Sequence, residues 1–248
     1  MGINMNRKKI HRLMNKYRLF CPIRKANPYR RMAKAIKTSN YADNILQRQF
    51  EAFGPEYVLL TDITYFFYGT KRSLSIIKDT FTKQILSYKL SKSMELDFVL
   101  DTMTSLLKNH SNDIHGDALI HSDPGAHYTS IKFIELLKSK NIRQSMSRRG
   151  NCWDNAPQES FFGHMKDEIN NKVKQCDNFE SVPSLIVDYI DYYNSNRYQI
   201  KLANLSPNEY LKYYKTGEYP LKHIIKENEL IKYNLEAIKE DRQYQDSL

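Results

Sequence analysis

Three carboxylates stand at positions where they could act together in catalysis. Asp62 lies inside an apolar run, Asp123 closes a second short apolar run, and Glu159 follows a proline that suits the first turn of a helix. A carboxylate within an apolar strand is costly unless it is paired or ligated. Such acids can converge on Mg²⁺ or Mn²⁺, which prefer oxygen ligands. Because two such ions can activate an attacking oxygen and stabilise a leaving oxygen at phosphorus, the pattern indicates phosphodiester chemistry.

Each of these acids also has an ordinary structural interpretation. Asp62 could be an edge-strand acid, Asp123 could start a turn before Pro124, and Glu159 could be a solvent-facing helix residue. The chain contains 28 acids, so a spacing match between some of them is common. Taken alone, the three acids leave both interpretations open.

The elements that must position these acids form an alternating α/β pattern. β-Branched and aromatic residues are enriched in the first expected strand, and apolar residues recur at helical spacing in the expected helices. The strands are expected at residues 57–66, 73–77, 84–90, 118–123 and 142–147, and the helices at 95–107, 131–140, 157–170, 182–194, 206–214 and 221–239. The order is three strands, then helix, strand, helix, strand and helix, followed by further helices.

Positive charge is concentrated at the N-terminus. The chain has 248 residues and a formal net charge of +10, yet residues 1–50 hold 13 Lys and Arg and a single acid, Asp43. Ile10 and Met14 mark the apolar face of a short helix, and basic residues lie off that face. Those basic residues are Lys8, Lys9, Arg12 and Lys16. The segment predicts contacts with DNA phosphates, with a plain basic linker as the alternative.

Composition excludes several classes of protein. No apolar run approaches the roughly 20 residues that span a membrane, so we expect no membrane protein. The basic N-terminus has no apolar stretch after it, which argues against a secretory signal. Cys21, Cys152 and Cys176 lie far apart, so we expect reduced thiols in a cytoplasmic protein rather than disulfides or a zinc site.

The short sequence motifs around the three acids resemble those of a known family. Residues 61–65 (TDITY), 121–128 (HSDPGAHY) and 150–162 (GNCWDNAPQESFF) are similar to the three catalytic motifs of OrfB-type insertion-sequence transposases, which carry a retroviral-integrase-like DDE core. Asp123 and Glu159 are separated by 35 residues, as in the family's DD(35)E pattern. The C-terminal YNxxR pattern is also present, with Gln199 where the family has His. The resemblance covers roughly residues 5–215.

The resemblance implies a fold and a reaction. The fold is ribonuclease-H-like, a mixed five-stranded sheet flanked by helices, with a small basic helical N-terminal segment and a helical C-terminal extension. It implies a DDE polynucleotidyl transferase that cleaves and transfers DNA strands at the ends of a mobile element, leading to its integration. Asp62 would ligate two Mg²⁺ ions, for which Mn²⁺ could substitute, while Asp123 and Glu159 would each hold one. A nuclease of the same fold and a non-catalytic DNA-binding derivative are the alternatives.

Several other residues are expected near the DNA. Lys166 follows Glu159 by seven residues, two helical turns, so both side chains share one face. Arg148 and Arg149 precede the third motif and could clamp a phosphate. His121 shares a strand face with Asp123 and could contact the DNA, with simple packing as the alternative. We expect Trp153 in the core, with stacking on a displaced base as the alternative.

Domain limits and partners follow from the same patterns. We expect a DNA-binding segment and linker at residues 1–50, a catalytic core with C-terminal helices at 51–215, and a helical tail at 216–248. The expected partner is double-stranded DNA, as element ends and target, in a homo-oligomer without membrane contact. The family resemblance implies a helix-turn-helix product of an upstream reading frame, fused or bound, and a bacterial cytoplasmic location at the nucleoid.

Overall fold

The chain forms two compact units. A computed structural model divides it into Met1–Ser39 and Asn40–Leu248, which are described separately. It describes residues 6–19, 41–51, 53–68, 70–92, 95–148, 152–176 and 181–221. The predicted tail helix at 221–239 and most of the predicted linker lie outside these residues.

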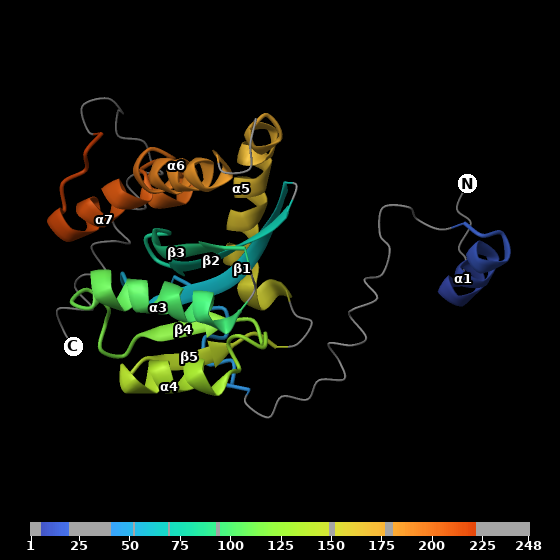
Figure 1. Cartoon of the computed structure of the whole chain (residues 1–248), viewed down its shortest axis with the longest axis horizontal. Coiled ribbons are helices and arrows are strands. Elements are labelled where there is room, and N and C mark those ends of the chain that lie inside the picture. The colour runs from blue at the N-terminus through green and yellow to red at the C-terminus, as the bar shows by residue number, and fades with distance from the viewer. Residues whose placement is uncertain are drawn as a thin grey trace. The chain divides into compact units, whose positions relative to one another are not determined.

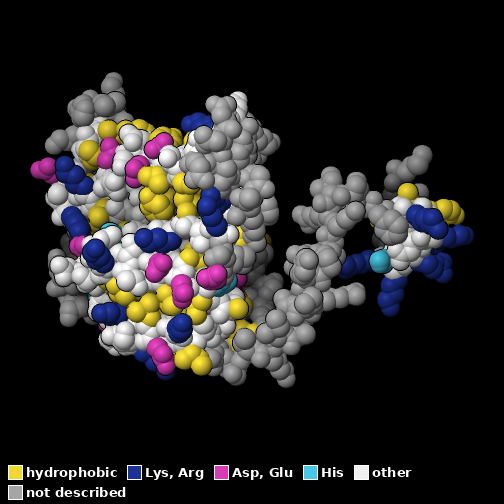
Figure 2. All heavy atoms as spheres, in the orientation of Figure 1, with side chains coloured by type: hydrophobic (Ala, Val, Ile, Leu, Met, Phe, Trp, Pro, Cys, Tyr) yellow, Lys and Arg dark blue, Asp and Glu magenta, His cyan; other side chains and the backbone are white. Residues whose placement is uncertain are grey.

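The first unit contains the predicted basic helix, α1 (Arg7–Lys16). The side chain of Asn6 caps the helix by accepting a hydrogen bond from the backbone N–H of Lys8 at 2.8 Å. No residue of α1 is buried, and Ile10 and Met14 are each 40% exposed. Lys and Arg side chains crowd the surface of this helix, whereas both charge signs are interspersed on the visible face of the second unit (Figure 2).

The second unit is built on a five-stranded mixed sheet with the order β3-β2-β1-β4-β5. β1 pairs antiparallel with β2 and parallel with β4, β2 pairs antiparallel with β3, and β4 pairs parallel with β5. The strands are β1 (Val58–Tyr68), β2 (Thr70–Asp79), β3 (Ile85–Ser91), β4 (Leu119–Ser122) and β5 (Arg143–Met146). All five expected strands are therefore present, and β2 is longer than expected.

Helices cover both faces of the sheet (Figure 1). On one face, Leu59 and Ile77 pack among residues of α3 and α4, and on the other face Leu74 and Ile76 pack among residues of α5 and α6. The helices are α3 (Leu96–His110), α4 (Ile131–Ser139), α5 (Ala156–Lys174), α6 (Ser181–Ser195) and α7 (Pro207–Thr216), with the 3-10 turns η1 (Cys152–Asn155) and η2 (Ile200–Leu202). The element order confirms the predicted α/β pattern.

The final helix begins as the sequence indicates. The Ser206 side chain accepts from the backbone N–H of Glu209, and the Glu209 carboxylate accepts from the backbone N–H of Ser206, which makes a capping box. Gly217 ends the helix with a φ of 75°, a left-handed conformation that glycine adopts without steric cost. Among the described residues, no helix is both long and apolar enough to cross a membrane.

The second unit begins earlier than the predicted boundary at residue 50. Leu46 is 2% exposed and packs against Val58, Leu60 and Leu119 in a small core cluster. The backbone N–H groups of Ile45 and Leu46 both donate to the hydroxyl of Ser145, at 3.0 and 3.2 Å. Residues 41–50 are therefore part of the core unit rather than of a basic linker.

Candidate active site

The first two acids lie side by side on neighbouring parallel strands. Leu60 of β1 is paired with His121 of β4, and Asp62 and Asp123 each follow two residues later. Because successive side chains alternate between the two faces of a strand, both carboxylates lie on the same face of the sheet. Asp62 is inside β1, whereas Asp123 comes directly after the last residue of β4.

The turn after β4 holds the carboxylate of Asp123 close to the backbone. The N–H of Gly125 donates to Oδ1 of Asp123 at 3.1 Å. A Cβ atom at position 125 would lie only 2.9 Å from the same oxygen. A side chain at position 125 would therefore displace the Asp123 carboxylate from this position, which accounts for the Gly in the second motif.

The third acid is carried by α5. Glu159 lies in the first turn of this helix and is solvent-exposed. The preceding turn, η1, contributes Asn155, whose side-chain N–H donates to Oδ2 of Asp62 at 2.9 Å. Asn155 thus links the start of α5 to β1 and orients the first acid, a contact that was not expected from the sequence.

The three acids influence one another electrostatically. Burial raises the pKa of Asp62 to about 7, and the negative charges of Asp123 and Glu159 add to that rise. The pKa of Asp123 is also raised, because neighbouring protein atoms desolvate its carboxyl. Close carboxylates with raised pKa values fit a divalent cation, which prefers oxygen ligands and would offset their repulsion. Asp62, Asp123 and Glu159 are therefore the residues that could hold a metal.

Lys166 lies beside this acidic group. It is half-buried on α5, two turns after Glu159. Burial lowers the pKa of Lys166, while the negative charge of Asp62 acts in the opposite direction. Lys166 is thus close enough to Asp62 for their charges to interact.

His121 is placed differently from the predicted DNA contact. Its side chain is fully buried, with Nδ1 2.9 Å from the hydroxyl of Ser145 and Nε2 3.0 Å from the hydroxyl of Ser147. Burial lowers the pKa of His121 to about 4. Because both ring nitrogens are already bonded inside the protein, His121 has a packing role, and the expected DNA contact is corrected.

A buried carboxylate that the sequence analysis missed organises the loop before α5. Asp154 is 1% exposed and accepts from the guanidinium groups of Arg148 and Arg48, each with a shortest contact of 2.8 Å. It also accepts from the side-chain N–H of Asn44 at 3.0 Å. These donors hold the pKa of Asp154 well below its usual range. Arg148 is only six residues away, but Arg48 and Asn44 lie 106 and 110 residues away in the chain, so no local signal could reveal those two.

The loop before α5 leaves the side chains of Arg148 and Trp153 largely exposed. The Arg148 guanidinium is engaged by Asp154 but its side chain remains 60% exposed. Arg149 lies outside the described residues. Trp153 is 69% exposed, so its expected place in the core is wrong. It directly precedes Asp154, whose burial fixes this turn instead.

The N-terminal basic residues are in the other unit. Lys8, Lys9, Arg12 and Lys16 all lie on α1, and none is buried. Their side chains are available to a partner of opposite charge.

A separate cluster in the second unit combines Glu56, His110 and Asp113, with one ligand atom from each within 4.8 Å of the others. It contains none of the three predicted catalytic acids.

Sequence comparisons place the chain among mobile-element proteins. An integrase core domain family matches residues 45–152, and a second integrase core domain family matches residues 159–213. The protein named transposase InsK for insertion sequence element IS150 from Escherichia coli (strain K12) is 36% identical over 210 residues, covering 84% of this chain and 72% of its own length. A transposase-like protein from Haemophilus influenzae is 37% identical over 212 residues, covering 84% of this chain and 94% of its own length.

Structural comparisons agree with the predicted fold. The simian T-cell lymphotropic virus intasome in complex with PP2A regulatory subunit B56 gamma gives a TM-score of 0.53 at 20% identity, covering 72% of this chain and 59% of that chain. The catalytic core domain of BIV integrase gives a TM-score of 0.50 at 18% identity, covering 65% and 98%. At these identities the likeness establishes the fold alone, and it confirms the ribonuclease-H-like core.

Together the motifs, the sheet and the comparisons establish the family. The integrase core indicates a dependence on divalent metal and an action on DNA. The chain covers most of the length of the insertion-sequence relatives described above. It therefore belongs to the insertion-sequence transposases with an integrase-like core, enzymes of the DDE polynucleotidyl transferase type that cleave and transfer DNA strands during transposition.

Proposed function

We propose that Asp62, Asp123 and Glu159 are the catalytic acids and that they bind two Mg²⁺ ions, with Mn²⁺ as a substitute. The observation that carries this proposal is the register of β1 and β4, which sets Asp62 beside Asp123. The effect of Glu159 on the pKa of Asp62 supports it further. Divalent cations held there supply positive charge that activates an attacking oxygen and stabilises a leaving oxygen at phosphorus.

The chain's own groups fix the orientation of these acids. Asn155 donates to one carboxylate oxygen of Asp62, and the N–H of Ile63 donates to the other at 2.7 Å. Gly125 does the same for Asp123 through its backbone N–H. Preorganised carboxylates need little rearrangement as the reaction proceeds, which is how a fixed site lowers a barrier.

The proposed DNA contacts lie on both units. We assign Lys166 to the DNA end at the active site because it lies close to Asp62. Arg148 and Arg149 would reach a phosphate from the loop before α5, and for Arg148 the exposed part of its side chain supports this role. The exposed basic residues of α1 would add contacts that do not depend on base sequence. These are Lys8, Lys9, Arg12 and Lys16.

The proposed assembly follows from the reaction. We propose that copies of this chain act as a homo-oligomer on double-stranded DNA, joining two element ends to a target. We also propose that an upstream-frame helix-turn-helix product, fused or bound, recognises the element ends. Such an enzyme would act in the bacterial cytoplasm, at the nucleoid where its DNA substrate is found.

A branched DNA oligonucleotide that mimics a strand-transfer product tests the proposal. The full chain is incubated with it in Mg²⁺, Mn²⁺ or EDTA, beside the Glu159→Gln variant. We expect metal-dependent resealing by the wild-type chain and none by the variant. Resealing by Glu159→Gln at the wild-type rate would overturn the assignment of the acids, and nicking without joining would indicate a nuclease.

A further inference from the structure

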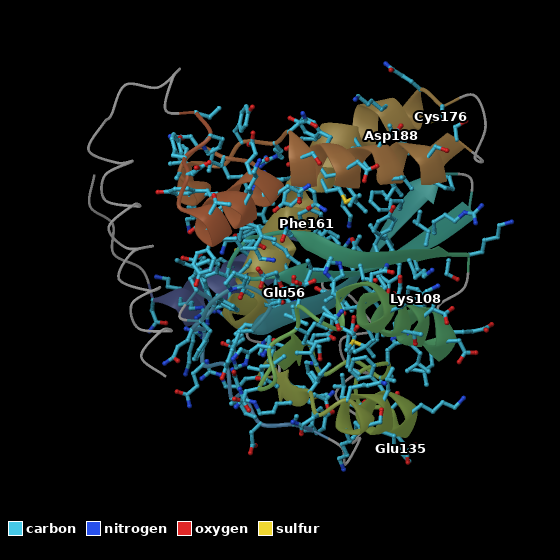
Figure 3. The ribbon with its side chains drawn as sticks, turned by 90° about the vertical axis from the view of Figure 1, so that its left-hand side faces the viewer. Glu56, Lys108, Glu135, Phe161, Cys176 and Asp188 are labelled. Carbon is cyan, nitrogen blue, oxygen red and sulfur yellow. The ribbon has the colours of Figure 1, made fainter. Side chains whose placement is uncertain are left out.

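A cavity of about 820 Å³ lies against α5 on a different face of the helix from Glu159. Pro157, Ser160, Phe161 and His164 line it, and their spacing of three and four residues puts them on one helix face. Phe161 is seen on α5, on the α6 side of the sheet (Figure 3). The other walls come from residues 48–51, the end of β2 and the loop after α6. The first turns of α5 therefore separate this cavity from the acidic group.

The lining of this cavity is strongly basic. One acid, Glu51, faces five cations, which are Arg48, Lys78, Lys83, Arg197 and Lys201. Three of these cations are already paired, Lys83 with Glu51, Arg48 with Asp154 and Arg197 with Glu168. Within the described part of the chain, no ion pair is recorded for Lys78 or Lys201. The cavity thus presents two ammonium groups without a carboxylate partner.

Lys78 is held in an unusual environment for a lysine. It is 4% exposed, and its Nζ has a single recorded acceptor among the described residues, the carbonyl of Pro157 at 3.4 Å. The ammonium also lies over the rings of Phe161 and Tyr193, at 5.2 and 5.9 Å from their centroids. Burial lowers the pKa of Lys78 to about 8. Since an ammonium carries three donors, Lys78 has donor capacity left for an anion in the cavity.

The cavity lies close to the proposed catalytic acids. In the β1–β2 pairing, Asp62 is opposite Ile76, and Lys78 follows Ile76 by two residues on the same face. Lys78 and Glu159 are then separated by little more than α5, whose diameter with side chains is roughly 10–12 Å. A nucleic-acid strand that entered the acidic group would have further phosphates on the Lys78 side of α5.

We propose that this cavity binds a backbone phosphate of the DNA strand on which the acids act, with Lys78 and Lys201 as the phosphate ligands. The inference rests on the proposed function and adds a second phosphate position to it. Lys201 is exposed at the mouth of the cavity, where its charge also acts on Glu51. Tyr198 and Ile200 are 58% and 71% exposed there and offer surface to a sugar or base.

Equilibrium DNA binding by the full chain provides the first test. A fluorescent 30-base-pair DNA is titrated in EDTA, so that no cleavage occurs, and the dissociation constant is followed against salt concentration. Loss of one phosphate contact reduces the salt slope by about 0.9 and weakens binding roughly fivefold at 0.15 M salt. We expect this change for Lys201→Gln and for Lys78→Met.

Lys212→Gln is the matched control. Lys212 is an exposed lysine of α7 that does not line the cavity, so its loss removes the same charge. The inference is overturned if Lys201→Gln and Lys78→Met both behave like Lys212→Gln. Because Lys201 is exposed, its variant cannot be dismissed as misfolded.

Chemical labelling of lysines identifies the class of ligand. Lys201 in the wild-type chain is modified with an amine reagent and read by mass spectrometry, alone or with DNA, inorganic phosphate or polyglutamate. We expect DNA to protect Lys201 at concentrations where the other two anions do not. Equal protection by polyglutamate would point to an acidic protein segment and would contradict the DNA assignment.

The two proposals can fail separately. Binding and labelling are measured without metal, so they report on the cavity even if the acids prove inactive. Conversely, metal-dependent resealing of branched DNA by the wild-type chain, together with unaltered DNA binding by both cavity variants, would leave the proposed function intact and remove only the second phosphate position.

Discussion

The two sides of α5 differ in the sign of the charge that they concentrate. On one side, burial raises the pKa of Asp62, and the negative charges of Asp123 and Glu159 add to that rise. On the other side, Lys78 is buried next to Arg197, and burial lowers the pKa of Lys78 to about 8. In each case the protein itself leaves like charges incompletely neutralised.

This difference shows how two sides of one helix can fit ligands of opposite charge. The acidic side fits a cation and the basic side fits an anion, and a metal-assisted reaction on DNA requires both. Buried charges of this kind lower the stability of a fold, and their retention is typical of sites whose ligands supply the missing countercharge. Substitutions on each side of α5 test whether the acids bind a cation and the lysines bind an anion.

The largest expected effect is on the acidic side. Asp62→Asn keeps the shape of the side chain but removes a negative charge that a metal would need. We expect the rate of branched-DNA resealing to fall at least about 1,000-fold, equivalent to roughly 4 kcal/mol in the barrier. The midpoint of thermal unfolding should not fall, because a buried charged group has been replaced by a neutral one.

Asp101→Asn is the matched control for this variant. Asp101 is an exposed residue of α3, so the same change there should leave resealing unaltered. A rate for Asp62→Asn within tenfold of the control would show that the acidic side is not the reaction centre, and the comparison between the two sides of α5 would then lose its basis.

The buried charge of Lys78 should lower the free energy of unfolding at neutral pH. The pKa of Lys78 falls from an ordinary 10.5 to about 8 on folding, a shift worth roughly 3 kcal/mol. The unfolded chain therefore binds more protons between these values, and wild-type stability rises with pH across that window. Below about pH 8 Lys78 is charged in both the folded and the unfolded state, so the whole destabilisation is present. Lys78→Met should unfold at higher denaturant concentration at pH 7.

This stability difference should disappear in alkali. Above pH 10.5 Lys78 is neutral in both states, so the free energies of unfolding of the two proteins should converge. The groups that act on Lys78 are Asp79, which favours its charge, and Arg197, which opposes it. A Lys78→Met variant that is no more stable than wild type at pH 7 would indicate that the ammonium is already satisfied within the fold.

Sequence patterns identified the acidic side of α5 but not the basic side. The acids occur in short sequence motifs, and the order of strands and helices is enough to predict that they meet at one edge of the sheet. The cavity depends on Lys78, which stands in a strand, and on Lys201, which lies more than 100 residues later in the chain. A strand lysine normally reaches solvent, but here Phe161 of α5 and Tyr193 of α6 cover the ammonium of Lys78.

The wrong prediction for Trp153 and the failure to identify Asp154 have the same origin. A tryptophan beside an aspartate suggests that the ring is buried and the acid exposed, on hydrophobicity alone. In the structure the ring of Trp153 is exposed and the carboxylate of Asp154 is buried, because the guanidinium groups of Arg48 and Arg148 both donate to Asp154 and compensate its burial. Long-range pairing of this kind is a property of the assembled fold and cannot be derived from one segment.

Loss of Asp154 is expected to have an intermediate effect. Asp154→Asn removes the charge to which both guanidinium groups donate, and we expect the free energy of unfolding to fall by about 2 kcal/mol at pH 7. The arginines lower the pKa of Asp154, so its stabilising effect is present above pH 4 and is lost as the pH falls toward that lowered value. Urea unfolding at pH 7 and pH 3 measures the difference, which should narrow in acid.

Asp117→Asn supplies the comparison for this measurement. Asp117 is exposed, and its backbone carbonyl rather than its side chain accepts from Arg143. Its variant should unfold within 0.5 kcal/mol of wild type. If Asp154→Asn matched it, the loop that precedes α5 would not depend on the buried carboxylate, and the position of Asn155 beside Asp62 would need another explanation.

The smallest single effects are expected for the exposed and half-exposed lysines, and they join the two sides of α5. Lys166→Gln should weaken DNA binding roughly fivefold at 0.15 M salt and lower the salt slope by about 0.9, as for one lost phosphate contact. Lys172→Gln removes an exposed lysine farther along the same helix and should change neither quantity.

The double variant Lys166→Gln/Lys201→Gln decides whether one DNA strand contacts both sides. Independent contacts add, so two phosphates bound at once predict a loss of roughly 25-fold and a slope lower by about 1.8. If the lysines instead competed for one phosphate, the double variant would resemble the weaker single variant. The additive result fits a DNA strand that passes over the first turns of α5, where the carbonyl of Pro157 accepts from the Lys78 ammonium.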